Sequence, residues 1–137
     1  MTDEPNWLSL ADLVAIHNRQ LAEHGGGEGL RDQGLLDSAL ACPRFTWQYA
    51  DPPPDLATLG AALAFGIITN HPFVDGNKRT GYVAWRLFLL INGSDIVANA
   101  DEKYLTFYAV AAGELAETEL ADWIRRHFLP VGSPPDG

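Results

Sequence analysis

A polar stretch at residues 71–81, with the sequence HPFVDGNKRTG, lies between the two most apolar segments of the chain. It combines a histidine, a carboxylate, a Gly-Asn pair and two adjacent cations. His71 can accept the proton of an attacking hydroxyl because imidazole titrates near neutral pH. Asp75 offers the oxygen ligands that Mg²⁺ prefers, usually together with the phosphates of a substrate. The stretch is therefore the predicted site of chemistry, with His71 as general base and Asp75 as metal ligand.

The residues Gly76, Asn77, Lys78 and Arg79 predict a phosphate site. Gly and Asn tolerate left-handed backbone, and such a turn makes successive N–H groups converge on an anion. A helix that begins near Asn77 would add the positive end of its dipole. Two cations at the positive end of a helix dipole are unfavourable unless an anion binds beside them. Lys78 and Arg79 therefore favour a bound phosphate over the other interpretation, a common Gly-Asn turn with a solvated charged face.

Two apolar segments, residues 55–70 and 77–92, must position this stretch. Both are apolar nearly all round, which is typical of helices buried at the centre of a bundle. Pro72 disfavours helix at His71, so the first helix is expected to end there. Because the connection at 71–76 is short, the two helices are predicted to be antiparallel and to present the site at one end of the molecule.

The N-terminal half predicts two further helices. A capping-box pattern begins at Ser9, and the helix that follows has His17 on its apolar stripe. His17 and His24 could form a two-histidine metal pair, but a packed core histidine is the simpler interpretation because no carboxylate motif accompanies them. Asp32 is expected to cap the second helix, which Pro43 should stop.

An extended flap is predicted after Pro43. Phe45, Trp47 and Tyr49 alternate as in an extended segment, and the prolines at 52–54 exclude helix. A loop whose aromatic side chains cover the core is one interpretation of this segment.

Two more helices are predicted at residues 101–112 and 119–128, after a short connection at 94–99. The expected fold class is therefore all-α. Residues 1–128 should form a single compact bundle of about six helices with the short flap, followed by a flexible C-terminal tail at 129–137.

Composition narrows the class of protein. The chain has 137 residues, a formal net charge of −9 and a pI near 4.6, which argues against direct nucleic-acid binding. Its single cysteine, Cys42, suits a reducing compartment and is expected to be a small buried residue. The N-terminus lacks the pattern of a signal peptide, and the longest apolar run, 56–69, is shorter than the roughly 20 residues of a membrane span. A cytoplasmic protein without a membrane segment is therefore expected.

Several stretches carry a resemblance to a known family. The sequence HPFVDGNKR at residues 71–79 resembles the signature of the Fic/Doc family. Other residues are similar to its Doc (death-on-curing) branch: Leu13 to His17, Gly25-Gly26, Gly29, Arg31-Asp32 and Leu35 to Leu40. The resemblance covers residues 7–128 and implies a small helical bundle. It also implies that a flap at Phe45, Thr46 and Trp47 holds the target peptide near the active site.

Lys78 separates two activities within this family. Adenylyl-transferring Fic enzymes usually have a second glycine where this chain has Lys78, and a second arginine that this chain lacks. A lysine there is a Doc feature and implies transfer of the terminal phosphate of ATP, with Mg²⁺, to a protein hydroxyl. His71 would be the base and Arg79 would stabilise charge. However, Gly76 and Pro72 differ from the best-known Doc proteins, so the chain is intermediate between the branches.

The resemblance to Doc implies a toxin of a type II toxin–antitoxin system that phosphorylates elongation factor Tu and stops translation. Two alternatives stay open: a Fic-type protein adenylyltransferase, and a non-catalytic module that binds a nucleotide or a partner. The self-inhibiting motif of Fic enzymes is missing, because Glu28 is the one glutamate followed by Gly or Asn and His24 occupies the position four before it. A small antitoxin acting in trans is therefore expected, with contacts at Phe45, Trp47 and Tyr49.

Overall fold

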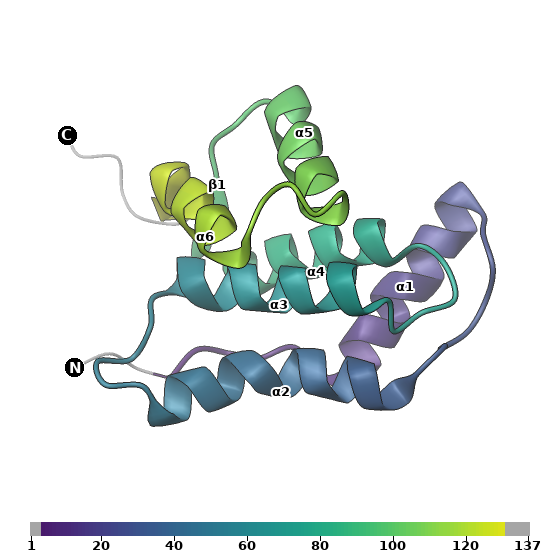
Figure 1. Ribbon diagram of the computed structural model, residues 1–137, viewed down its shortest axis with the longest axis horizontal. Coiled ribbons are helices and arrows are strands. Elements are labelled where there is room, and N and C mark those ends of the chain that lie inside the picture. Colours follow the sequence, from purple (N-terminus) through teal and green to yellow (C-terminus); the bar gives the residue numbers. More distant parts are fainter. Residues whose placement is uncertain (1–3, 131–137) are drawn as a thin grey trace.

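The computed structural model describes residues 4–130 and confirms the all-α class (Figure 1). Within that range the chain forms six helices and one two-stranded sheet. The helices are α1 (Leu10–His24), α2 (Gln33–Tyr49), α3 (Leu56–Asn70), α4 (Asn77–Ile91), α5 (Ala100–Ala111) and α6 (Glu117–Arg126). The strands are β1 (Ser94–Ile96) and β2 (Phe128–Pro130), which pair antiparallel. No helix in this range has both the length and the hydropathy that crossing a membrane requires.

Short polar side chains cap four of the six described helices, and two of these caps, Ser9 and Asp32, are predicted from the sequence. Ser9 accepts a hydrogen bond from Asp12 N, and the Asp12 carboxylate accepts one from Ser9 N, so the capping box at α1 is confirmed. Asp32 caps α2 by accepting from Leu35 N. Asp55 and Asn99 cap α3 and α5 in the same way.

The hydrophobic core is built around α3, which runs through the middle of the molecule with α2 on one side and α5 and α6 on the other (Figure 1). Its antiparallel pairing with α4 is confirmed. The two helices approach closely at Gly81, where an added Cβ would lie 2.7 Å from Ile68 Cγ1. The predicted burial on all sides holds for α3, but α4 has an exposed side that includes Arg86 and Leu90.

The prediction that Pro43 stops α2 is wrong, because the helix continues to Tyr49. An interior proline removes one helical hydrogen bond and usually costs about 3 kcal/mol. Here Pro43 is buried and lies beside Leu63 and Phe88, so tertiary packing offsets that loss. The helix ends instead before the prolines at 52–54.

The expected extended flap is also wrong, because Phe45, Thr46 and Trp47 lie in the last turns of α2. Phe45 and Tyr49 stack on the exposed face of the helix with ring centroids 5.7 Å apart, a helical spacing of four residues. This end of α2 and the loop between α3 and α4 lie at opposite ends of the molecule (Figure 1). Cys42, predicted to be buried, is exposed on the same helix.

The C-terminal part differs from the prediction at its boundaries. The connection after α4 contains β1, and α6 begins and ends two residues earlier than expected. Arg86 has a structural role, because its guanidinium pairs with Asp95 of β1 at 3.2 Å. Of the expected tail, Leu129 and Pro130 belong to β2, and residues 131–137 lie outside the described residues.

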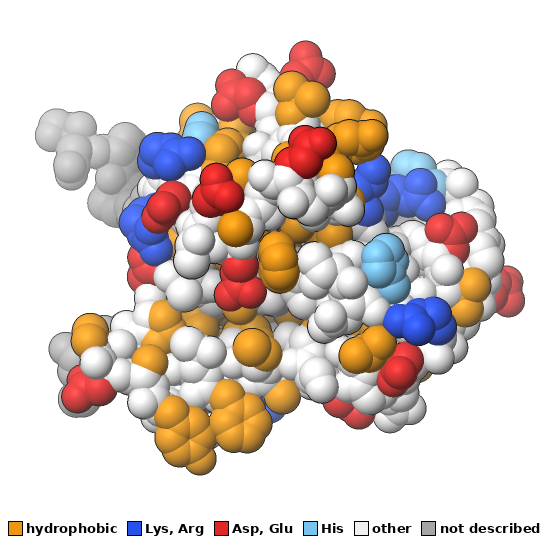
Figure 2. Space-filling model, viewed as in Figure 1, with side chains coloured by type: hydrophobic (Ala, Val, Ile, Leu, Met, Phe, Trp, Pro, Cys, Tyr) orange, Lys and Arg blue, Asp and Glu red, His pale blue; other side chains and the backbone are white. Residues whose placement is uncertain are grey.

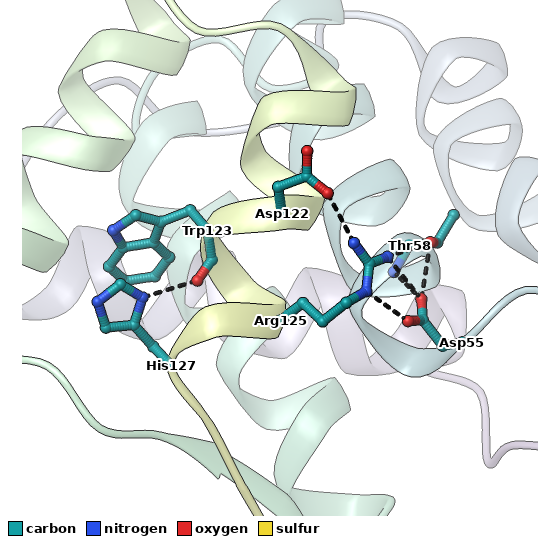
Figure 3. Close-up of polar contacts among 6 residues, drawn as sticks. All are labelled: Asp55, Thr58, Asp122, Trp123, Arg125 and His127. Atoms are coloured by element: carbon teal, nitrogen blue, oxygen red, sulfur yellow. Dashed lines mark hydrogen bonds and ion pairs between the residues drawn. The ribbon is translucent and has the colours of Figure 1, made fainter.

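An ion pair joins α6 to the start of α3 (Figure 3). Arg125 Nε lies 2.8 Å from Asp55 Oδ2, and Arg125 Nη1 lies 2.7 Å from Asp122 Oδ1. The hydrogen bond from Arg125 is the main cause that lowers the pKa of Asp55 from 3.8 to about 2, and Thr58 contributes further hydrogen bonds. The pair therefore stabilises the folded state wherever Asp55 is ionised.

This pair predicts a pH-dependent difference between the wild type and Asp55→Asn. Because the folded pKa of Asp55 lies below its unfolded value, the stabilisation is present above about pH 4 and is lost as the pH falls through 2. Asn still caps α3, so the variant removes the ion pair selectively. Both side chains are about half exposed, so we expect the free energy of unfolding to fall by roughly 1 kcal/mol at pH 7. Urea unfolding should show this difference at pH 7 and a much smaller one at pH 2, where about half of the folded Asp55 is protonated. An equal difference at both pH values would contradict the prediction.

Candidate active site

The loop at residues 71–76 joins α3 to α4 and holds unusual backbone at both ends. His71, the C-cap of α3, is left-handed with φ 51° and ψ 57°. Left-handed backbone costs a non-glycine residue about 1–3 kcal/mol and persists only where the surroundings enforce it. Gly76, the N-cap of α4, has φ 76°, which glycine adopts without strain. Gly76 thus has the left-handed backbone predicted for it, whereas Asn77 is already helical.

Arg31 enforces the conformation of His71. Its Nε donates to His71 O at 2.7 Å, and its Nη2 donates to Asn70 O at 2.8 Å. Its backbone N donates to Pro72 O at 2.7 Å. The guanidinium therefore satisfies carbonyls at the end of α3 and also places a cation at the negative end of that helix dipole.

Asn77 holds the middle of the loop from the other side. Its Oδ1 accepts from Phe73 N and its Nδ2 donates to Phe73 O, both at 3.0 Å. Phe73 is 1% exposed, so these backbone groups have no access to water. The side chain of Asn77 is thus committed to the loop, whereas its backbone N–H belongs to the first turn of α4.

His17 supports the same loop from α1. Its ring stacks on Phe73 with centroids 3.9 Å apart, and its Nε2 lies 2.8 Å from Asp75 O. The interpretation as a packed core histidine is confirmed, because His17 is 1% exposed while His24 is exposed on the last turn of α1. Among residues 4–130, no group of three or more His, Cys, Asp or Glu side chains could hold a metal.

The carboxylate of Asp75 is held by backbone N–H groups. Oδ1 accepts from Gly76 N at 2.8 Å, and Oδ2 accepts from Gly27 N at 3.3 Å. Both bonds lower the pKa of Asp75, and the bond from Gly76 has the larger effect. Asp75 is therefore ionised at neutral pH. The exposed carboxylate keeps lone pairs for a cation, and one carboxylate with substrate phosphates is the usual Mg²⁺ set. A Cβ at Gly26, which has φ 125°, would lie 2.8 Å from Asp75 Oδ2.

Positive groups gather where α4 begins. The first turn of a helix leaves backbone N–H groups without acceptors, and Gly76 supplies no side-chain cap. Arg79 Nη2 donates to Gly25 O at 3.4 Å, and its buried Nε has no hydrogen-bond partner within the described part of the chain. Lys78 follows Asn77 on the same turn. Figure 2 shows Lys, Arg and His side chains together near this loop, bordered by hydrophobic side chains over α5.

The predicted site residues line one cleft of about 280 Å³. Its lining contains His71, Val74, Asp75, Gly76, Asn77, Lys78 and Arg79. This volume is at the lower end of the roughly 300–1,000 Å³ typical of small-molecule sites, so the cleft fits phosphate groups rather than a whole nucleotide. Phe45, Thr46 and Trp47 do not line it.

Sequence reasoning missed that Arg31 and His17 support the loop, and that Gly26 leaves room for the Asp75 carboxylate. The one signal for Arg31 was its place in the stretches that resemble the Doc branch. Hydrogen bonds to backbone carbonyls leave no pattern in a single sequence, because any loop can accept them.

Comparison with known proteins decides the family. A sequence model described as the Fic/DOC family matches residues 7–89, which include Arg31, the whole loop and most of α4. The chain belongs to the Fic/DOC family. This confirms the resemblance carried by residues 71–79, and the helical bundle is the fold expected for a Fic/DOC domain.

Two relatives are named Doc. Over 77 residues, 56% of this chain, the sequence is 46% identical to the protein named Toxin Doc of Mycolicibacterium smegmatis. That match spans 59% of the toxin, less than two thirds of its length. Over 121 residues, 88% of this chain and 94% of the relative, it is 29% identical to Protein kinase doc of Escherichia phage P1.

The contacts of Arg31 with the Fic/DOC loop predict that Arg31→Ala destabilises the protein. Two carbonyls lose their donors, so the free energy of unfolding should fall by about 1–2 kcal/mol. Arg19→Ala is the matched control. Within residues 4–130 Arg19 pairs with Glu23 alone, on an exposed face, so this substitution should change the free energy of unfolding by less than about 0.5 kcal/mol. Urea unfolding measures both values. Equal losses in the two variants would show that Arg31 does not hold the loop.

Proposed function

We propose that the protein transfers the terminal phosphate of ATP to a hydroxyl group of a target protein. The observation that carries this proposal is the single cleft in which an exposed imidazole, an ionised carboxylate and two cations meet the start of a helix. In phosphoryl transfer the protein mainly positions the reactants and neutralises charge, and these groups can do both.

The polar groups of the cleft have separate roles in this reaction. The target oxygen forms a bond to the terminal phosphorus, the bond from that phosphorus to the ADP oxygen breaks, and His71 takes the proton of the hydroxyl. The N–H groups at the start of α4 and the cations Lys78 and Arg79 hold the phosphates. Asp75 would bind Mg²⁺, which supplies charge neutralisation when it is bound.

Lys78 favours phosphate transfer over adenylyl transfer. A long cationic side chain replaces the small residue of the adenylyl-transferring pattern, and it fills part of the cleft lining. The name of the phage relative, Protein kinase doc, is in keeping with this choice. The target is a protein hydroxyl, and elongation factor Tu is the candidate to test first.

Intact-mass measurement tests the proposal directly. The purified protein, MgATP and elongation factor Tu are incubated, and the target is weighed before and after. We expect the addition of one phosphate. An added AMP would identify the protein as an adenylyltransferase instead, and label from ATP carrying radioactivity on its first or terminal phosphate separates the same outcomes. No added mass on any candidate target, with ATP still bound, would favour a binding module.

We also propose that the protein is a toxin controlled by a small antitoxin, as the name Toxin Doc of the mycobacterial relative suggests. A groove of about 880 Å³ along α2, with Leu8, Leu40, Phe45 and Trp47 in its wall, supports a docking place for such a partner. Expression of the chain alone should stop growth, and co-expression of the neighbouring small gene should restore it. Normal growth with soluble, folded protein would argue against the toxin assignment.

A further inference from the structure

Two exposed tyrosines on α5 lie beside the start of α4. Tyr104 and Tyr108 are 61% and 51% exposed, and their rings stack with centroids 6.0 Å apart. They are four residues apart on the helix, so both rings lie on the same face. Neither residue lines the cleft described above.

The cation that faces these rings is Lys78. Its Nζ lies 5.6 Å from the centroid of Tyr104 and 5.1 Å from that of Tyr108, both within the reach of cation–π attraction. No carboxylate in residues 4–130 pairs with Lys78, whereas Arg86 on the same helix pairs with Asp95. Lys78 also belongs to the lining of the phosphate cleft, so one side chain contacts the two rings and borders the cleft.

An aromatic holder has a physical advantage at this place. A lysine side chain is flexible, and ordering it on binding costs affinity. A carboxylate partner would order it but would also repel the incoming phosphate. The face of a tyrosine ring attracts the ammonium through its quadrupole and carries no net charge, so the cation stays available to an anion.

We propose that Tyr104 and Tyr108 are positioning residues that hold the Lys78 ammonium at the edge of the phosphate cleft. The inference rests on the proposed use of that cleft for the phosphates of ATP. It gives α5, which supplies no residue to the cleft, a part in binding polyphosphate.

The test measures binding of inorganic triphosphate by calorimetry, because this probe needs no target and no group transfer. Replacing both tyrosines with leucine should weaken binding roughly three- to tenfold, since two weak cation–π contacts are lost. Replacing both with phenylalanine should restore most of the affinity, because the ring faces remain. Leu105→Ala, on the same helix and 64% exposed, is the control that should bind as the wild type does.

A double-mutant cycle shows whether the tyrosines act through Lys78. In a Lys78→Ala background, the leucine pair should cause no further loss. The same loss in that background, or unchanged binding by the leucine pair, would overturn the inference. A gain in affinity would also overturn it, because it would mean that the rings hold the lysine away from the anion.

The two proposals can fail separately. If the tyrosine substitutions change triphosphate affinity as expected but no group is transferred to a target protein, the positioning role stands and the transferase assignment fails. If phosphate is transferred to the target but the tyrosine substitutions leave triphosphate affinity unchanged, the transferase assignment stands and the positioning role fails. A wild-type protein that binds no triphosphate would refute the positioning role outright.

Discussion

His71→Asn is expected to lower the rate of phosphate transfer by a factor of about 10²–10⁴, the usual contribution of a general base. The imidazole of His71 is exposed in the cleft. Under the proposed function it would take the proton of the target hydroxyl. Asparagine cannot accept that proton at neutral pH. It does tolerate left-handed backbone, so the φ of 51° at this position should be kept. Steady-state rates, measured by mass spectrometry of the target, check the prediction.

The controls for this variant separate chemistry from folding. His24→Asn changes a half-exposed histidine at the end of α1 and should leave the rate unchanged. Triphosphate affinity and the urea midpoint of His71→Asn should stay close to wild type, because the Arg31 bonds reach the backbone carbonyl and not the ring. A variant that transfers phosphate at the wild-type rate would exclude His71 as the base.

Asn77→Ala is expected to lower the free energy of unfolding by about 2–4 kcal/mol, because it leaves the N–H and C=O of a buried residue without partners. Both groups belong to Phe73, which is 1% exposed and contacts His17. Urea unfolding measures the loss. Activity should fall with it, since the loop that carries His71 and Asp75 loses its central support.

A second asparagine provides the matched control. Asn99→Ala removes the cap of α5 on the surface and should cost only about 1 kcal/mol. If the two alanine variants lost the same stability, the buried bonds of Asn77 would not support the loop. If Asn77→Ala kept full stability but lost triphosphate affinity, its side chain would instead belong to the phosphate site.

The parts of the fold that could be predicted rest on local rules. Ser9 and Asp32 cap helices through bonds to residues three positions away, and Pro72 ends α3 through its own ring. Helix capping and helix termination therefore depend on only a few consecutive residues. The site residues at 71–79 are equally local, since one loop and one helix start carry all of them.

The failures came where packing between distant segments decides the structure. Pro43 reads as a stop because a proline breaks an isolated helix, but its burial beside Phe88 keeps α2 intact. The wrong helix end at Pro43 also led to the wrong prediction of an extended flap. Aromatic and other residues alternate from Phe45 to Tyr49, and no local rule forbids an extended chain there. The type of residue alone predicts that Cys42 is buried. Because α2 begins at Gln33 and continues through Pro43, Cys42 lies on the exposed face of the helix.

Arg31 could not have been found by local rules either. Its partners are carbonyls 39 and 40 residues away along the chain. A carbonyl oxygen is present at every position, so the sequence of the loop does not indicate that an arginine binds there. Only the fold brings the donor and its acceptors together.

The connection between α1 and α2 touches the loop at several points, through Gly27 N, Gly29 O and the Arg31 backbone and side chain. Surface loops ordinarily tolerate insertions and deletions. We expect this connection not to tolerate them, because it is bonded to the 71–76 loop at both ends. If a single residue were added or removed between Gly27 and Arg31, the bonds at one of the two ends would be lost. We therefore expect the number of residues in this connection to matter to the site as much as their identity.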